Sequence, residues 1–220
     1  MTHPEPWPLR HLVLRTPRLE LRPDDDAGLL ELAEEAQHGV HPPEEMPFSV
    51  PWTDADPRDL GRGTLQFFWR QRARCEPQDW TVNFLVRSEG RVVGMQGLVG
   101  HGFRTVGEVE TGSWIGLRHQ GRGIGTEMRA AVLAFAFDHL GALRARSGAF
   151  TDNTASRRVS APSASAVTSV GRKATNTVPV DERAIGSTEP RPRLVTNGLR
   201  LRCQWITVGP RLLHTERSAV

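Results

Sequence analysis

Hydrophobic and polar positions near the start of the chain follow two different spacings. Residues 16–23 alternate apolar and polar side chains and stop at a proline, which predicts a short strand. The acidic run 24–26 can cap a helix that continues to Gln37. We expect the apolar face of this helix to contain Leu29, Leu30, Leu32 and Ala33.

A loop and a second helix are expected next. Residues 39–57 contain five prolines, which favours a loop over any regular element. A helix from Pro57 to Arg74 follows. Its clustered positions are Leu60, Thr64, Phe67 and Phe68, and we expect both phenylalanines to pack in the core or against helices.

Strand signals dominate the middle of the chain. The pattern at residues 80–86 and 91–98 predicts a hairpin around the turn Glu89-Gly90. Another strand is predicted over residues 108–117. A glycine-rich segment then leads into a helix over about 123–139. Its apolar positions recur at helical spacing: Met128, Ala131, Val132, Phe135 and Ala136. A strand near 143–149 and a helix beginning at Asp152-Asn153 follow.

The pattern changes after Ser160. Residues 160–168 have no amphipathic spacing, and Pro162 interrupts the helix. Weak strand signals remain at 175–180 and 193–196. We expect a core domain over 1–160. Residues 161–220 are then the C-terminal part of the same domain, with an atypical sequence, a partly disordered tail and weakened packing.

Composition narrows the function classes. The net charge of +3 is small and comes from interspersed residues, so it does not indicate nucleic-acid binding. Cys75 and Cys203 lack the spacing of a metal or redox site. There is no apolar run of membrane-spanning length and no signal-peptide pattern near the N-terminus. We therefore expect a cytoplasmic protein without a metal ion or membrane contact.

The clearest indication of a ligand site is a glycine-rich segment, Gln120-Gly121-Arg122-Gly123-Ile124-Gly125. Glycines let backbone N–H groups approach an anion, and the start of a helix favours negative charge. Arg122 can add a charge-assisted bond to a phosphate. A tight strand-to-helix turn would also need glycines. A Walker loop is excluded because Gly-Lys-Ser/Thr is absent. A Rossmann loop is also disfavoured, because it should follow the first strand of a parallel unit, whereas this segment follows several hairpin-like strands.

Three motifs in order resemble one family. They are Thr-Pro-Arg-Leu-Glu-Leu-Arg-Pro at 16–23, the glycine segment at 120–125 and Asp-Asn-Thr-Ala-Ser at 152–156. Residues 16–160 resemble the GNAT superfamily of N-acetyltransferases, especially the branch of ribosomal-protein N-terminal acetyltransferases. The local sequences at 46–48, 51–54 and 110–114 are similar to those of actinobacterial members of this branch, and this similarity adds succinyl-CoA to acetyl-CoA as a candidate donor. The resemblance implies an α/β (α+β) fold with a central, mixed, mostly antiparallel sheet flanked by helices, here with a perturbed C-terminal third.

The resemblance also implies where acetyl-CoA or succinyl-CoA binds. The strand end would pair its backbone with pantetheine, and the loop amides would hold the pyrophosphate. Asn153 would bond to the pantetheine arm, and Ser156 would lie near the sulfur and help the thiolate leave. An N-cap role for Asn153 or Asp152 is the alternative. The implied cofactor-binding residues are Trp114, Ile115, Gly116, Leu117, Gln120, Gly121, Arg122, Gly123, Ile124, Gly125, Thr126, Asn153 and Ser156.

Amine acylation needs a base, and Glu110 is the best candidate because it lies on the strand before the loop and aligns with a family glutamate. A solvated strand glutamate is the alternative. Glu108 lies on the same face by its period of two. His101 and His119 are secondary candidates, although a lone histidine is usually structural.

Phe48, Trp52 and Trp114 are candidates for the wall of an acceptor pocket, with core packing as the alternative. The chain has no tyrosine, so a family tyrosine acting as general acid has no counterpart here. Ser156, water or no acid must then serve. Residues 161–168 depart from the family pattern, and we hypothesise a reading-frame change or an insertion there.

The leading hypothesis is direct transfer of an acetyl or succinyl group from acyl-CoA to a primary amine. A non-catalytic acyl-CoA-binding or sensing module is the first alternative, and a nucleotide-binding regulator is another. The acceptor stays open between a protein N-terminus, an antibiotic amine and a polyamine. We also expect a homodimer or higher homo-oligomer.

Overall fold

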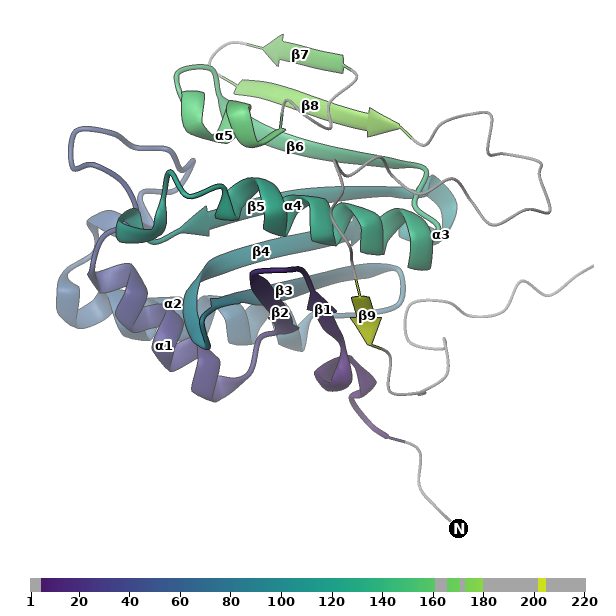
Figure 1. Ribbon diagram of the computed structural model, residues 1–220, viewed down its shortest axis with the longest axis horizontal. Coiled ribbons are helices and arrows are strands. Elements are labelled where there is room, and N and C mark those ends of the chain that lie inside the picture. The colour runs from purple at the N-terminus through teal and green to yellow at the C-terminus, as the bar shows by residue number, and fades with distance from the viewer. Residues whose placement is uncertain (1–4, 161–165, 171–172, 180–201, 205–220) are drawn as a thin grey trace, which may run out of the picture.

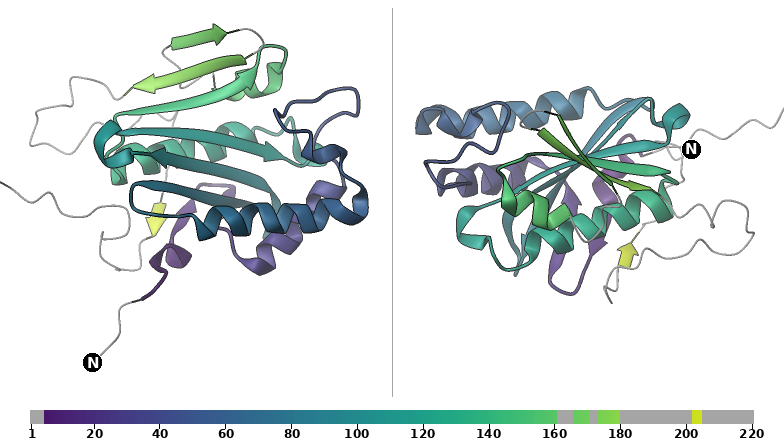
Figure 2. Two further views of the ribbon diagram at one scale, coloured as in Figure 1. Left: turned by 180° about the vertical axis from the view of Figure 1, so that it is seen from behind. Right: turned by 90° about the horizontal axis from the view of Figure 1, so that it is seen from above.

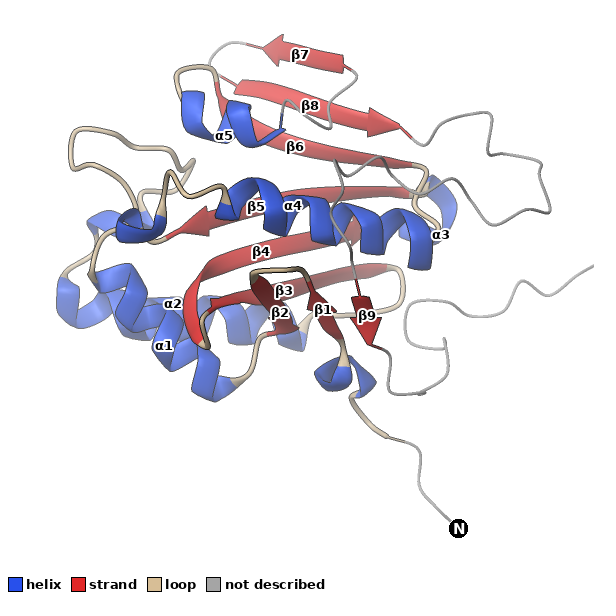
Figure 3. Cartoon of the chain, in the orientation of Figure 1, coloured by secondary structure: helices blue, strands red, loops and turns tan. Residues whose placement is uncertain are grey.

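The computed structural model describes residues 5–160, 166–170, 173–179 and 202–204. These residues form one nine-stranded sheet in the order β7-β8-β6-β5-β4-β3-β2-β1-β9 (Figure 1). Neighbouring strands are antiparallel except for the parallel pair β5 and β6. Helices flank the sheet, as Figure 3 shows by secondary structure. The expected mixed, mostly antiparallel sheet is therefore confirmed.

The strands and helices have the following bounds. The strands are β1 (Val13–Arg15), β2 (Leu19–Pro23), β3 (Asp79–Ser88), β4 (Arg91–His101), β5 (Glu108–Ile115), β6 (Arg144–Phe150), β7 (Ala166–Val170), β8 (Lys173–Pro179) and β9 (Arg202–Gln204). The helices are α1 (Asp26–Gln37), α2 (Pro57–Ala73), α3 (Phe103–Val106), α4 (Ile124–Ala134) and α5 (Thr154–Ser160). Short 3-10 turns cover Pro8–His11, Trp52–Asp54 and Leu117–His119, and α4 continues as a π-helical turn over Phe135–His139.

The sheet separates two layers of helices. Helices α1 and α2 cover one face, and α4 and α5 cover the other, as the view from above in Figure 2 shows. Apolar residues from both strands and helices fill each interface. The largest core cluster includes Phe84, Val109, Met128 and Val132, and a second cluster joins α1 and α2 to β3 and β4. Phe135 is buried as expected, and Phe137 is buried too.

The hairpin and the helix caps follow directly from local sequence. Glu89 and Gly90 both have positive φ, 51° and 81°, which suits the tight turn between β3 and β4. Asp25 accepts a hydrogen bond from the N–H of Gly28 at 2.7 Å and caps α1. Asp56 caps α2 in the same way. The predicted hairpin and the predicted cap of α1 are therefore confirmed, while the cap of α2 was not predicted.

Two residues expected on buried helix faces are exposed. Leu30 of α1 is 61% exposed and Phe67 of α2 is 47% exposed. Each helix packs against both the sheet and the other helix, and the buried stripe passes through Leu29, Leu32 and Phe68 instead. The prediction for Leu30 and Phe67 was wrong, because the apolar face that helical spacing predicts for each helix is wider than the surface that the helix buries.

Several boundaries also differ from the sequence pattern. β2 begins at Leu19 rather than Thr16, because residues 16–18 turn to bond with α4. β5 ends at Ile115, and the next residues form a 3-10 turn. Strands β1, β7 and β9 were not predicted, while β8 covers most of the weak signal at 175–180. The weak signal at 193–196 and residues 161–165 of the atypical octapeptide lie outside the described residues.

The parallel pair separates part of the way along its length. β5 and β6 are in register only from Glu108 with Arg144 to Thr111 with Ser147. Beyond Thr111, β5 keeps β4 as its neighbour and β6 keeps β8. Both strands then end and start helices, α4 and α5, at the same end of the sheet (Figure 1). The diverging strand ends and the two helix starts enclose the candidate site, which we call the fork.

Candidate active site

The glycine loop between β5 and α4 presents a row of backbone donors. Gly121 and Gly123 have φ of 72° and 76°, a region that side chains disfavour. None of the N–H groups of residues 121–126 donates a hydrogen bond to another described residue. The loop therefore offers six adjacent amide donors at a helix N-terminus, the arrangement that binds phosphate groups.

A buried carboxylate fixes the end of this loop. Glu127, in the first turn of α4, is 5% exposed and accepts a hydrogen bond from Arg18 Nε to its Oε2 at 2.7 Å. Arg18 also donates from Nη1 to the carbonyl of Arg122 at 2.9 Å, and Thr16 bonds to Glu127. We call this group, which consists of Thr16, Arg18 and Glu127, the rear clamp. The sequence pattern missed it, although an acidic residue between the apolar positions of a buried helix was a signal.

A second buried carboxylate fixes the start of the loop. Glu35 of α1 is 2% exposed and accepts hydrogen bonds from Arg118, with Nε to Oε2 at 3.1 Å. His119 Nε2 lies 3.4 Å from Glu35 Oε1, so this histidine is part of the same group. We call Glu35, Arg118 and His119 the front clamp. Gly116 belongs beside it, because a Cβ there would overlap the Glu35 carboxylate.

Gln120 completes the anchoring of the loop. Its side-chain amide donates to the carbonyl of Val40 at 2.7 Å and to that of Ile115 at 2.8 Å. These bonds join the loop to the segment after α1 and to the end of β5. The side-chain N–H groups of Gln120 therefore already have acceptors within the protein, and a ligand would have to contact other groups of the loop.

The motif at the start of α5 lies at the second branch of the fork. Asn153 Oδ1 accepts a hydrogen bond from the Ser156 N–H at 2.9 Å, so the capping role considered for Asn153 is present. Gly125 of α4 faces α5: a Cβ at this position would lie 3.1 Å from Val159 Cγ2. The close approach of α5 to the first turn of α4 thus leaves little room for a side chain at Gly125.

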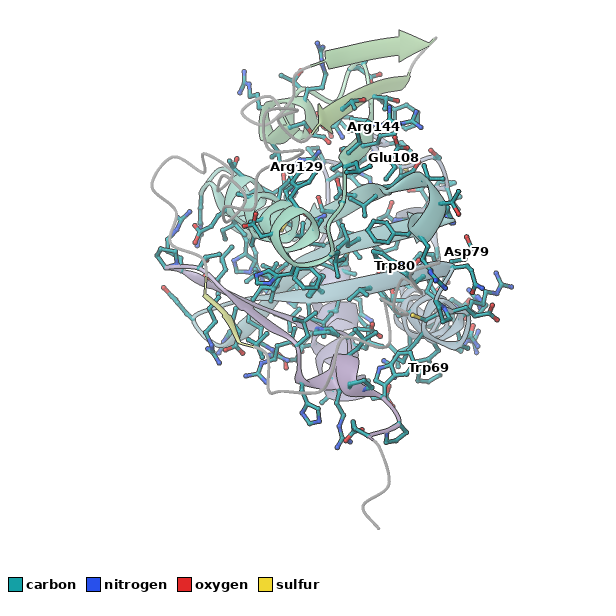
Figure 4. The ribbon with its side chains drawn as sticks, turned by 90° about the vertical axis from the view of Figure 1, so that its right-hand side faces the viewer. Trp69, Asp79, Trp80, Glu108, Arg129 and Arg144 are labelled. Atoms are coloured by element: carbon teal, nitrogen blue, oxygen red, sulfur yellow. The ribbon has the colours of Figure 1, made fainter. Side chains whose placement is uncertain are left out.

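The two strand glutamates have different surroundings. Glu108 lies 3.3 Å from Arg146 Nη1 and 3.7 Å from Arg144 Nε, and Figure 4 shows it beside Arg144. Glu110 is exposed, and its carboxylate pairs with no described side chain. Glu110 shares a sheet face with Trp114, four residues along β5. Of the two, only Glu110 has a carboxylate that is not held by neighbouring arginines.

The aromatic candidates form one row. The ring centroids of Phe48 and Trp52 are 5.3 Å apart, and those of Trp52 and Trp114 are 5.6 Å apart. All three rings are half-buried and pack against the apolar residues of α1 and α2. His41 continues the row, with its ring near Phe48 and its Nε2 2.7 Å from Thr53 Oγ1. The structure thus places side by side the three residues that the sequence analysis named as candidates for one pocket wall.

Neither histidine candidate forms an ion pair or a hydrogen bond with Glu110 in the described residues, although His101 is only two positions from Val99, the residue opposite Glu110. His101 is largely exposed at the end of β4, 3.4 Å from Asp79, at the end of the sheet opposite the loop. His119 belongs to the front clamp. Among the described residues, no cluster of three or more His, Cys, Asp or Glu side chains is placed to hold a metal ion. No helix in the described ranges is both long and apolar enough to cross a membrane.

Known proteins share this sequence pattern and fold. Residues 12–162 match the acetyltransferase (GNAT) domain family. Mycobacterium smegmatis RimJ, solved in complex with CoA-disulfide, is 20% identical with a TM-score of 0.62 over 82% of this chain and 91% of its own. RimL, a ribosomal L7/L12 alpha-N-protein acetyltransferase in complex with coenzyme A, is 14% identical with a TM-score of 0.55 over 75% of this chain and 96% of its own. A GCN5-related N-acetyltransferase from Brucella melitensis is 19% identical with a TM-score of 0.56 over 81% and 82%.

Proposed function

We propose that this chain, which belongs to the acetyltransferase (GNAT) domain family and is an acyltransferase, moves an acyl group from acyl-coenzyme A to a primary amine. The observation that carries the proposal is the row of unpaired amides at residues 121–126, at the point where β5 and β6 have separated. These donors suit the pyrophosphate of coenzyme A. RimJ and RimL, which share the fold, were solved with coenzyme A bound.

The donor would extend from the loop into the fork. The amides of residues 121–126 hold the pyrophosphate, with Arg122 adding a charge. The backbone of the end of β5 and of the residues that follow it, from Trp114 to Leu117, pairs with the amide groups of pantetheine. Asn153 uses its side-chain N–H groups on the pantetheine arm, because its Oδ1 already caps α5. Ser156 lies next to it in the first turn of α5.

The chemical step follows from the placement of Glu110. Its carboxylate accepts a proton from the acceptor ammonium, directly or through water, and the neutral nitrogen attacks the thioester carbon. A C–N bond forms, the C–S bond breaks, and the second proton of the attacking nitrogen passes through Ser156 or water to the thiolate, which leaves as the thiol. Buried backbone dipoles at the strand edge stabilise the developing negative charge. No tyrosine exists in the chain to act as the acid.

The acceptor would enter from the face of the sheet that carries Glu110 and Trp114. The row of Phe48, Trp52 and Trp114 forms one wall of this approach. Aromatic faces attract ammonium groups by cation–π interaction. This wall supports a primary amine attached to an apolar or aromatic group, and the N-terminus of a protein is one such acceptor.

Glu110→Gln tests this function, with Glu108→Gln as the matched control on the same strand face. Turnover is measured as release of free coenzyme A from acetyl- and succinyl-CoA with a panel of primary amines, and affinity for coenzyme A by calorimetry. We expect Glu110→Gln to lower kcat by about 100-fold or more without weakening coenzyme A binding. The control should stay near wild type.

Two results would contradict the assignment. Unchanged turnover in Glu110→Gln would remove Glu110 as the base. A wild-type protein that binds coenzyme A tightly and acylates no amine would favour a sensing module on the same fold.

A further inference from the structure

Arg129 is a buried cation with unused hydrogen-bond donors. This α4 residue is 4% exposed, and its Nη1 donates to Thr111 Oγ1 of β5 at 2.8 Å. Its Nε and Nη2 atoms are fully buried and find no hydrogen-bond partner among the described residues. It forms no ion pair with a carboxylate in the described ranges. Figure 4 shows Arg129 beside α4, on the side toward the strands that follow it.

Such a residue is costly to keep without an anion. A guanidinium loses its hydration on burial and regains stability only from an opposite charge and a full set of hydrogen bonds. Desolvation lowers the pKa of Arg129 to about 10, which still leaves it protonated at neutral pH. Its two unused donors are on one edge of a planar group, which matches the two oxygens of a carboxylate.

The position of Arg129 connects it to the fork. Thr111, its partner, is the last residue of β5 in register with β6, opposite Ser147. Both side chains are buried on the face of the sheet that α4 covers. Arg129 is also one helical turn from Gly125, where α4 meets Val159 of α5. The guanidinium therefore lies where the strands begin to separate, with α5 nearby.

We propose that Arg129 selects the acyl donor, by binding the terminal carboxylate of a dicarboxylic acyl group such as succinyl on coenzyme A. The inference rests on the proposed function, because it needs a thioester held in the fork. Glu110 and Arg129 come from opposite faces of the sheet: even positions of β5 carry the base, and odd positions such as Thr111 face the arginine. The amine would then approach from one side while the acyl chain extends to the other. The carboxylate is unchanged in the transfer and remains on the amide product.

A purely structural role is the competing explanation. In that case Arg129 serves only to join α4 to β5 through Thr111, and donors differing in charge should be treated alike. The acyl groups succinyl and butyryl separate the two cases, because both have four carbons and only succinyl carries a carboxylate.

The test uses calorimetry on the full chain with succinyl-, butyryl-, acetyl- and free coenzyme A. We expect wild type to bind succinyl-CoA at least about tenfold more tightly than butyryl-CoA. Arg129→Met should abolish this preference and leave the affinity for free coenzyme A unchanged. Arg129→Lys should keep part of the preference, because it keeps the charge without the planar pair of donors. Thermal unfolding of each variant checks that it folds.

Each outcome separates the two proposals. Equal binding of succinyl- and butyryl-CoA by wild type would overturn the role of Arg129 even if both variants failed to fold. An equal loss for all four ligands in folded Arg129→Met would also overturn it and would indicate a structural role. Failure of wild type to bind any coenzyme A compound would refute the proposed function itself.

Discussion

The β5–α4 and β6–α5 junctions occupy equivalent places, because each follows one strand of the parallel pair and starts a helix at the same end of the sheet. They are built differently. The first has two left-handed glycines, and the front and rear clamps hold its backbone from both sides. The second depends on one capping asparagine and a seven-residue helix.

The difference assigns separate tasks to the two junctions. The β5–α4 loop holds its amides in place before any ligand arrives, which lowers the ordering cost of binding. Helix α5 takes its position from α4, through the contact of Gly125 with Val159. The first junction is thus a preformed anion site, and the second is a wall placed against it.

Removing the rear clamp, which holds only the β5–α4 junction, should cause the largest loss of stability. Glu127→Ala takes away the buried acceptor of Arg18 and Thr16, and we expect it to lower the free energy of unfolding by about 3 kcal/mol. Urea unfolding followed by tryptophan fluorescence measures the change. Arg58→Ala, which breaks an exposed pair with Asp56, is the control and should leave stability unchanged. Equal stability of the two variants would show that the clamp does not hold the loop.

A smaller effect is expected from a change of one loop glycine. Gly123→Ala places a Cβ on a residue with φ of 76° and 3.3 Å from Arg18 Nη2, which should cost about 1–2 kcal/mol. Displacement of the neighbouring amides should also weaken coenzyme A binding by about tenfold. Gly63→Ala in α2, where a Cβ meets nothing within 4 Å, should instead stabilise the protein by up to about 1 kcal/mol. Wild-type affinity in Gly123→Ala would argue against the loop as the pyrophosphate site.

The smallest effect should come from the second junction. Asn153→Ala removes the bond to the Ser156 N–H and should lower the local stability of α5 by about 1 kcal/mol. Hydrogen exchange at Ser156 and the next amides measures it. Asn153→Asp keeps the acceptor and should exchange like wild type. Faster exchange throughout α4 as well would show that the two junctions are not as separate as their structures indicate.

Local pattern was sufficient for the features that depend on neighbouring residues. The glycines at 121 and 123 revealed the loop because only glycine suits their backbone angles. The Glu89-Gly90 hairpin and the cap of α1 were predicted for similar local reasons. Phe48, Trp52 and Trp114 were predicted as candidates for one pocket wall, and the fold places their rings in one row.

Features that join distant segments were not predictable in this way. The pairs Arg18–Glu127 and Arg118–Glu35 connect residues that no helical or strand period relates. Arg129 occurs one residue after the predicted core position Met128, so helical spacing did not mark it as buried. The spacing of α4 alone could not reveal that α5 lies close to the same side of this helix. Leu30 failed for the opposite reason, since its spacing suited the core but no element covers it in the described structure.

The two clamps also determine when the donor site can form during folding. Arg118 and Glu35 are 83 residues apart in the chain, and Arg18 and Glu127 are 109 apart. Closing such long loops costs chain entropy before the contacts repay it, so these pairs are expected late on the folding pathway. A nascent chain could form the front clamp only after residues 118 and 119, and the rear clamp only after helix α4, had been synthesised. Affinity for coenzyme A would then report the completion of folding, and refolding followed by coenzyme A binding should lag behind the burial of Trp80 in the core.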